Sequence, residues 1–159
     1  METERVSIEV EVNGIRYKRT IRPSVSLLDF LREELSLKGT KKGCDSGQCG
    51  ACTILMDGRT VDACLVLAIQ AGGKEILTIE GLSSGGRLHP LQEAFVEEGA
   101  VQCGFCTPGM ILSAKALLDE KKDPSEEEIR EAISGNLCRC TGYVKIIKAV
   151  QKAAAMMRV

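Results

Sequence analysis

Residues 40–53 read TKKGCDSGQCGACT and place three cysteines within nine positions, at Cys44, Cys49 and Cys52. Thiols spaced this closely can converge on one bound group only if the loop curls tightly around it. Glycine reaches backbone angles closed to other residues. Three glycines are interspersed with the cysteines, at Gly43, Gly47 and Gly50. A curled loop also points N–H groups inward, where they stabilise anions. The segment therefore predicts a loop that wraps thiolates around a bound group.

The spacing Cys-x4-Cys-x2-Cys, with Cys64 as a distant fourth ligand, is typical of plant-type ferredoxins. Those proteins hold a [2Fe–2S] cluster. Structural zinc sites usually bring their ligands in paired knuckles, so three ligands on one loop are atypical of zinc. Reduced structural cysteines are the other alternative. We expect a [2Fe–2S] cluster held by Cys44, Cys49, Cys52 and Cys64, with the three glycines forming its surroundings.

A second group of cysteines consists of two pairs, Cys103-x2-Cys106 and Cys138-x-Cys140. Each pair precedes a predicted helix start, at Thr107-Pro108 and at Thr141. Helix N-termini present unpaired N–H groups and the positive end of the helix dipole, and both stabilise thiolates. Two converging helix starts would make a four-sulfur pocket for a second cluster. Zinc or structural thiols remain the alternatives, although Cys-x-Cys is uncommon in zinc knuckles.

Charged residues near the cysteines allow two interpretations. Arg139 lies between two predicted ligands, and it is either a solvated surface residue or a charge that favours the reduced cluster. For Lys41 and Lys42, beside the first loop, a solvated face is the better interpretation. His89 is the only histidine, so a Rieske centre, which needs two, is excluded. We expect His89 to lie exposed near a helix start.

The first half of the chain has the pattern of a small mixed sheet packed by one helix. Residues 6–12 and 15–21 alternate between apolar and polar, and Asn13-Gly14 between them is a strong hairpin signal. Strands are also predicted at 53–56, 59–63 and 74–80, with a turn at Asp57-Gly58. Ser26 caps a short helix whose apolar face extends to Leu35.

Beyond about residue 81 the strand pattern stops and helical signals follow. Helices are predicted from His89-Pro90 to residue 96, from Thr107 as N-cap, from the Ser125 capping box to about residue 134, and after residues 141–142. The sequence thus predicts an α+β protein with two domains, 1–81 and 82–159.

Composition and charge exclude several functions. The net charge is −1 and aromatic residues make up 3%, so neither a basic patch nor stacking platforms favour nucleic-acid binding. No export signal or transmembrane segment is recognisable, and we expect a cytoplasmic protein, in which cysteine groups more often bind metal than form disulfides. No catalytic triad, acid–base pair or phosphate loop is present, so no catalytic residue is predicted.

Three motifs together resemble one known family. They are the loop at 40–53, QCGFCTPG at 102–109 and GNLCRCTGY at 135–143. Their order and the short interval from Cys52 to Cys64 resemble the iron–sulfur subunits, or N-terminal regions, of the molybdenum hydroxylases, the xanthine oxidase relatives. That family includes carbon monoxide dehydrogenase, quinoline and isoquinoline oxidoreductases, nicotinate dehydrogenase, 4-hydroxybenzoyl-CoA reductase and aldehyde oxidoreductase. The resemblance covers nearly the whole chain. Val144 departs from it, because many relatives have glutamine there.

The resemblance implies a β-grasp 2Fe–2S ferredoxin-like domain followed by an all-α four-helix 2Fe–2S domain. It also implies a relay in which electrons leave a molybdopterin centre on a large subunit, pass through the helical and then the ferredoxin-like domain, and usually reach FAD on a medium subunit. Gln102 and Cys140 match family positions near the pterin. The expected assembly is a dimer of heterotrimers, with molybdopterin and FAD supplied in trans.

Two other functions remain open at this point. A free, diffusible two-cluster ferredoxin would carry the same cysteines, but an exposed apolar surface on its helical domain would need a partner. A zinc-stabilised interaction module would contain zinc at both sites without iron or sulfide.

Overall fold

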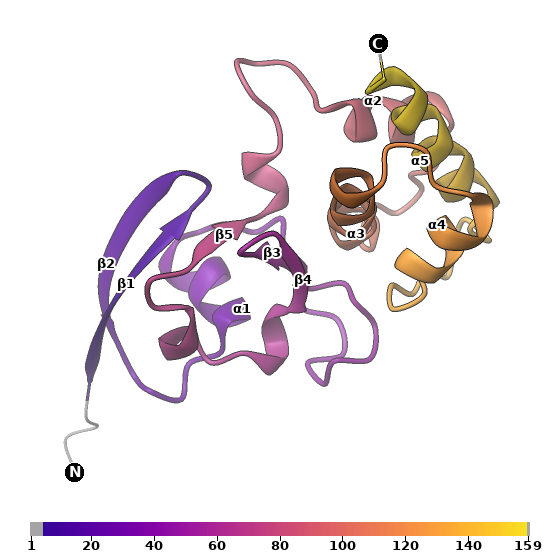
Figure 1. The fold of residues 1–159 in the computed structure, drawn as a ribbon. Coiled ribbons are helices and arrows are strands. Elements are labelled where there is room, and N and C mark those ends of the chain that lie inside the picture. The colour runs from indigo at the N-terminus through magenta and orange to yellow at the C-terminus, as the bar shows by residue number, and fades with distance from the viewer. Residues whose placement is uncertain (1–4, 159) are drawn as a thin grey trace.

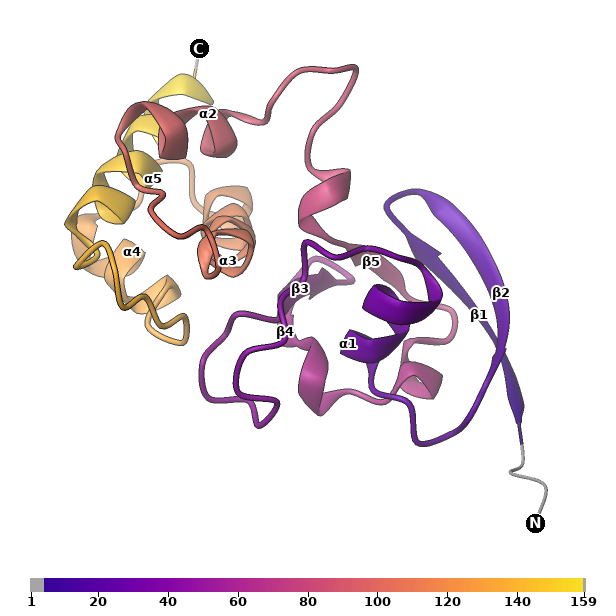
Figure 2. The same cartoon turned by 180° about the vertical axis from the view of Figure 1, so that it is seen from behind.

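The computed structural model describes residues 5–158, which form a sheet lobe followed by a helical lobe (Figure 1). The lobes are joined by the extended segment after β5, and they also face each other where helix α3 lies beside the hairpin of β3 and β4 (Figure 2). The β1–β2 hairpin is on the side of the sheet lobe away from the helices. This arrangement confirms the expected α+β fold.

Among the described residues, the sheet lobe has five strands and one short α-helix besides several single helical turns: β1 (Val6–Val12), β2 (Ile15–Ile21), α1 (Leu27–Asp29), β3 (Thr53–Met56), β4 (Arg59–Asp62) and β5 (Glu75–Leu77). The strand order is β2-β1-β5-β3-β4. Strands β1 and β5 run parallel, and the other neighbouring pairs are antiparallel. This mixed sheet curves around α1, and the long connection from α1 to β3 carries the first three cysteines.

Both predicted hairpin turns are present. Asn13 and Gly14 have φ of 54° and 77°, and Asp57 and Gly58 have φ of 49° and 77°. Two consecutive positive φ angles are the signature of a type I′ turn, whose twist matches that of the flanking strands. The second turn reverses the chain after β3, so that β4 returns Cys64 to the first cysteine loop.

The helix that Ser26 caps packs into the core of the sheet lobe, where it meets apolar side chains of the strands. The Asp29 N–H donates to Ser26 Oγ at 3.0 Å, as the capping signal predicts. Leu27, Leu28, Phe30 and Leu31 are fully buried. After Asp29 the helix widens, because the Leu35 N–H reaches the Phe30 carbonyl five residues back. The sequence predicted the helix but not this widened turn.

The helical lobe contains α2 (Pro90–Glu97), α3 (Thr107–Glu120), α4 (Glu126–Ala132) and α5 (Val144–Met156). Their inward faces share one core, which includes Leu91, Phe95, Met110, Ile129 and Val150. Four α-helices within the described residues agree with the expected four-helix domain. Of the helices described, none is long and apolar enough to cross a membrane.

Several predicted element boundaries are wrong: β4 ends at Asp62 rather than at residue 63, β5 begins at Glu75 rather than at residue 74, and α4 ends at Ala132 rather than near residue 134. Three others have a clear structural setting. The fifth strand ends at Leu77 rather than at residue 80, because Thr78 leaves the sheet to bond the Asn13 side chain. Thr107 is the first residue of α3 rather than its N-cap; the cap position is Cys106. Helix α5 begins at Val144 rather than near residue 141, after Tyr143 with a φ of 69°.

The division between the lobes lies near Gly81. A short turn, Ile79–Gly81, follows β5, and the next residue, Leu82, is buried in the core of the helical lobe. Ile79 is partly buried against that same core. We propose Gly81 as the last residue of the first domain, which gives domains 1–81 and 82–159.

Candidate metal centres

The first cysteine loop is closed by backbone hydrogen bonds at its base. The Lys41 N–H donates to the Ala51 carbonyl at 3.2 Å, and the Ala63 N–H donates to the Cys52 carbonyl at 3.3 Å. The second bond helps to place Cys64, in the short turn Ala63–Leu65 that follows β4, beside Cys52. The structure therefore brings Cys64 to Cys52, while Cys44 lies beside Cys49 within the loop.

Backbone N–H groups of this loop point at sulfur atoms. Those of Ser46 and Gln48 donate to Cys44 Sγ at 3.4 and 3.3 Å, and that of Cys44 donates to Cys49 Sγ at 3.4 Å. The Ser46 side chain and these N–H groups lower the pKa of Cys44 to about 6. The loop is thus arranged to stabilise negative sulfur, as an iron–sulfur cluster requires.

The three glycines of the loop lie where a side chain has no room. A Cβ atom at Gly43 would stand 2.7 Å from Cys49 Sγ, and one at Gly47 would stand 2.3 Å from the Leu65 side chain. At Gly50 it would stand 2.4 Å from the Gly135 carbonyl oxygen of the helical lobe. Gly47 and Gly50 also have positive φ. Larger residues at these positions would displace the loop, and with it either its own cysteine side chains or its contact with the helical lobe.

The second cysteine group joins the start of α3 to the loop before α5. Cys140 Sγ lies 3.6 Å from Cys103 Sγ. Cys138 Sγ accepts from the Thr141 N–H at 3.4 Å and lies 3.1 Å from the Thr141 hydroxyl. The Cys138 N–H donates to the Tyr143 hydroxyl at 2.8 Å. Cys138 Sγ is in turn a hydrogen-bond neighbour of Cys106.

The thiols of the two groups differ in how readily they ionise. Burial raises the pKa of Cys52 and of Cys106 to about 12. The thiol of Cys103 raises the pKa of Cys140. Burial also opposes ionisation of Cys138, but the hydrogen bonds from Thr141 outweigh it, so that the pKa of Cys138 is lowered. Metal ligation requires thiolates, so filling the two pockets must release protons from the buried cysteines.

The eight cysteines contact each other two by two. The neighbouring pairs are Cys44 with Cys49, Cys52 with Cys64, Cys103 with Cys140 and Cys106 with Cys138. Within residues 5–158, no three Cys, His, Asp or Glu side chains gather around a point that suits a single metal ion. A zinc ion needs its four ligands around one point, whereas a [2Fe–2S] cluster takes two thiolates on each iron. The donor set therefore fits two-iron clusters better than zinc.

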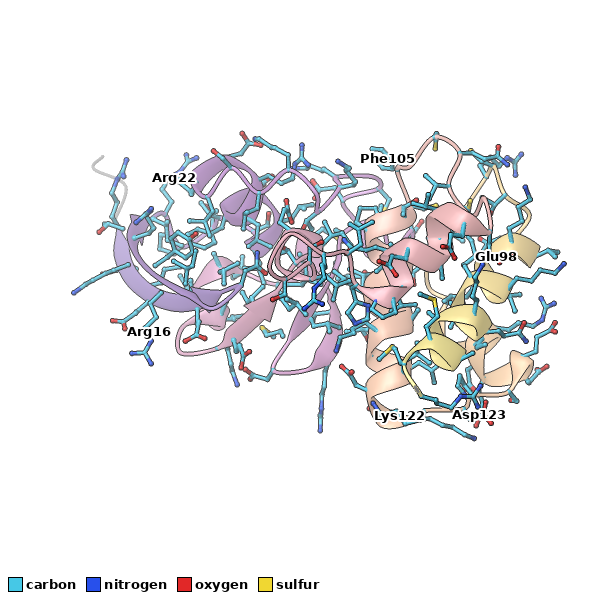
Figure 3. All side chains as sticks on the ribbon, turned by 90° about the horizontal axis from the view of Figure 1, so that it is seen from above. Arg16, Arg22, Glu98, Phe105, Lys122 and Asp123 are labelled. Carbon is cyan, nitrogen blue, oxygen red and sulfur yellow. The ribbon has the colours of Figure 1, made fainter. Side chains whose placement is uncertain are left out.

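Other predicted site residues lie at the surface of the helical lobe. Gln102 Nε2 donates to the Cys140 carbonyl at 3.1 Å, so these two exposed residues form one unit. Arg139, between Cys138 and Cys140, is exposed. Three apolar side chains close in sequence to these cysteines are exposed: Leu137 is 57% exposed, Val144 55% and Phe105 47%. Phe105 lies near the boundary between the lobes (Figure 3) and approaches Gly43 of the first loop.

His89 is not exposed as expected, but half-buried as the N-cap of α2. The Leu91 N–H donates to His89 Nδ1 at 3.2 Å, and the His89 N–H donates to the Gln92 side chain at 2.9 Å. Burial, and next the charge of Lys115, lower the pKa of His89. The residue is therefore a structural cap.

We expect this cap to make the helical lobe less stable in mild acid. Because the folded-state pKa lies below the unfolded value of about 6.5, the unfolded chain binds the proton better, and stability falls as pH drops below that value. Urea unfolding measures the free energy of unfolding at about pH 7.5 and about pH 5.5. Between these pH values it should fall less for His89→Asn than for the native chain, because asparagine keeps a capping side chain but does not titrate. His89→Ala should cost about 1 kcal/mol at the higher pH. Equal pH slopes for His89→Asn and the native chain would contradict this assignment.

Two residues of this region carry contacts that the sequence analysis did not assign to them. Asn136 is 3% exposed and bonds to both lobes. Tyr143 donates its hydroxyl proton to the Asn136 carbonyl at 3.2 Å while accepting from the Cys138 N–H. Both residues stand in the GNLCRCTGY motif. The Tyr143 contacts stay within that motif, whereas nothing in the local pattern reveals that Asn136 bonds to the sheet lobe.

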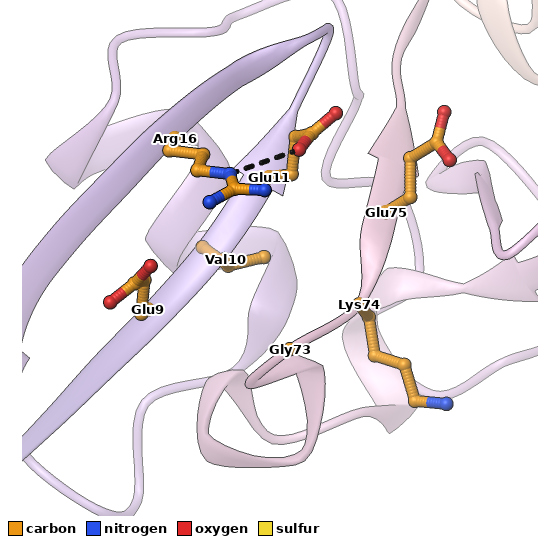
Figure 4. A pocket seen from close by; sticks show the side chains of 7 residues that line it. All are labelled: Glu9, Val10, Glu11, Arg16, Gly73, Lys74 and Glu75. Carbon is orange, nitrogen blue, oxygen red and sulfur yellow. Dashed lines mark hydrogen bonds and ion pairs between the residues drawn. The ribbon is translucent and has the colours of Figure 1, made fainter.

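A groove of about 300 Å³ lies far from the cysteines, between β1 and β5 (Figure 4). Its lining side chains carry both charges, and Arg16 pairs with Glu11 at 3.5 Å. Glu9, Lys74 and Glu75 also line it. The groove contains no cysteine or histidine, and we assign it no role.

Comparisons with known proteins match both halves of the chain to iron–sulfur families. Residues 10–77 match the family described as a 2Fe-2S iron-sulfur cluster binding domain, and residues 78–151 match a [2Fe-2S] binding domain. The nicotinate dehydrogenase small FeS subunit of Eubacterium barkeri is 51% identical over 149 residues, or 94% of this chain and 95% of that one. The xanthine dehydrogenase iron-sulfur-binding subunit of Escherichia coli O157:H7 is 46% identical over 150 residues, or 93% of this chain and 94% of that one.

A solved structure has the same fold. It belongs to quinoline 2-oxidoreductase from Pseudomonas putida 86, and it matches with a TM-score of 0.94 and 47% identity over 97% of this chain and 96% of that one. The resemblance inferred from the cysteine motifs is thereby confirmed, along with two 2Fe–2S binding domains. This chain belongs to the family of small iron–sulfur, electron-transfer subunits of the molybdenum hydroxylases.

Proposed function

We propose that this chain relays electrons between a molybdopterin-bearing catalytic subunit and a FAD subunit or other acceptor. The observation that carries the proposal is the two-by-two contact of eight cysteines, two pairs in each lobe, which we take to form one cluster pocket in each lobe. Two such pockets in one chain suit a relay, because the chain supplies position and potential while the substrate chemistry belongs to a cofactor elsewhere.

The proposed ligands follow the two pockets. Cys44, Cys49, Cys52 and Cys64 hold the cluster of the sheet lobe. Cys103, Cys106, Cys138 and Cys140 hold that of the helical lobe. A bound [2Fe–2S] cluster takes up and releases one electron at a time. The chain's own contribution is to hold its thiolates in place and to direct N–H groups at the sulfur atoms, as at Cys44 and Cys138.

We further propose that electrons reach the chain at the Gln102–Cys140 unit. Both residues are exposed, and the bond from Gln102 Nε2 fixes the Cys140 carbonyl at the surface. Leu137, Val144 and Phe105, which lie close in sequence to the cysteines of the second group, are exposed apolar side chains that a partner subunit would cover. That partner is the large pterin-bearing subunit, and a medium FAD subunit completes a heterotrimer that pairs into a dimer in the cytoplasm.

Anaerobic preparation of the recombinant chain tests the proposal. We expect about four irons and about four sulfides per chain, and two distinct paramagnetic signals after reduction, since each [2Fe–2S] cluster becomes paramagnetic with one electron. From its native host the chain should copurify with molybdenum- and flavin-bearing subunits. Zinc at both sites without sulfide would refute the cluster assignment. A stable monomer from that host, without such partners and able to reduce several acceptors, would instead favour a free ferredoxin.

A further inference from the structure

The two cysteine loops meet at one buried side chain, that of Asn136. Its Nδ2 donates to the Gly50 carbonyl at 2.9 Å and to Thr53 Oγ1 at 3.0 Å, both in the sheet lobe. Its Oδ1 accepts from the Ser113 hydroxyl of α3 at 2.7 Å. Asn136 is only 3% exposed, so these bonds are shielded from competing water. One amide thus links the two lobes directly beside both cysteine groups.

The backbone around Asn136 is too closely packed to slide. A Cβ atom at Gly50 would stand 2.4 Å from the Gly135 carbonyl oxygen, and one at Gly109 would stand 2.3 Å from the Gly50 carbonyl oxygen. Both obstacles are backbone atoms, which cannot rotate away as a side chain can. The glycines let α3 and the Asn136 segment approach the first loop at the distance where the amide bonds form.

This packing brings Cys49, a proposed ligand of the first cluster, into contact with the segment that carries Cys138, a proposed ligand of the second. The Leu137 N–H donates to the Cys49 carbonyl at 2.9 Å, and Leu137 is followed directly by Cys138. Asn136 is held from the other side, because its carbonyl accepts from the Tyr143 hydroxyl that also binds the Cys138 N–H. A short path of covalent bonds and one hydrogen bond therefore runs from Cys49 to Cys138.

We propose that Asn136 is a positioning residue that fixes the separation of the two iron–sulfur pockets and keeps the Cys49–Leu137 hydrogen bond closed. This inference rests on the proposed function. Electron transfer through protein weakens steeply with distance and passes more readily along bonds than across gaps. Loss of the amide would remove its three side-chain bonds, two of which join the lobes, and would leave the Ser113 hydroxyl without its buried partner, although the Gly50 carbonyl keeps its bonds from Thr53. We expect the lobes to separate locally and admit water.

The test is the magnetic interaction between the two clusters in the fully reduced chain, which falls with the cube of their separation. We expect the native chain to show splitting of its low-temperature paramagnetic signals. Asn136→Ala should retain the iron and sulfide content of the native chain but show narrowed or lost splitting. Ser113→Ala, which removes only the bond to Oδ1, should narrow it less.

Asn13→Gly is the matched control. Like that of Asn136, the Asn13 side chain both donates and accepts: it donates to Thr78 Oγ1 and accepts from the Thr78 N–H, in contacts that involve no cysteine-bearing loop, and its positive φ suits glycine. It should leave the splitting unchanged even if stability falls. Native splitting in a cluster-loaded Asn136→Ala chain would overturn the inference. If that variant fails to load, native splitting in Ser113→Ala would do so. A native chain without iron would instead overturn the proposed function.

Discussion

Replacing Cys106 with alanine is expected to remove the cluster of the helical lobe and to leave that of the sheet lobe in place. Cys106 is half-buried beside Cys138, and no other thiol within the described residues of this lobe can replace it. Iron and sulfide per chain should therefore fall by about half, and one of two paramagnetic signals should vanish. In the assembled complex, turnover with the final acceptor should stop, because the relay would lose the cluster nearest the proposed entry point at Gln102 and Cys140.

Cys52→Ala gives the reciprocal experiment. Cys52 is buried beside Cys64 in the other pocket, so this variant should lose the other paramagnetic signal and a similar amount of iron. The two variants together assign each signal to a lobe. Full iron content in either variant would show that the removed cysteine is not a ligand.

Gly50→Ala is expected to destabilise the chain by about 2–4 kcal/mol, since it combines a positive φ with overpacking against backbone. The new Cβ would stand 2.4 Å from the Gly135 carbonyl oxygen and 2.6 Å from Asn136 Nδ2. The two lobes would have to move apart at the point where they bond. Denaturant unfolding of the cluster-loaded chain measures the change.

Gly58→Ala is the matched control for this substitution. Gly58 has a φ of 77°, and nothing lies within 4 Å of the position of its Cβ, so only the backbone cost of about 1–2 kcal/mol applies. The difference between the two variants isolates the clash between the lobes. Equal losses of unfolding free energy in the two variants would mean that the lobes accommodate the added Cβ at Gly50 at no cost, and would contradict the prediction.

Features that depend on neighbouring residues could be predicted well from the sequence. The Asn13-Gly14 and Asp57-Gly58 turns follow from residues that tolerate positive φ, and the Ser26 and Ser125 caps follow from side chains three residues from the N–H they accept. The wrongly predicted boundary of β5 has a different origin, because there a distant contact overrides a local preference. Thr78 suits a strand by its propensity, yet it bonds Asn13 instead, 65 positions away in sequence.

The cysteine motifs, by their spacing and by resemblance, were enough to indicate two clusters and the family, because ligand spacing is constrained by the metal group itself. Other features depend on tertiary structure and could not be predicted from the sequence. They are the two-by-two sulfur contacts, the parallel pairing of β1 with β5 and the bond from Asn136 to Gly50. Asn136 and Gly50 are 86 positions apart, and no local periodicity specifies which distant groups will meet. Packing of the two lobes selects those contacts, since a buried amide must find its partners wherever the folded chain places them.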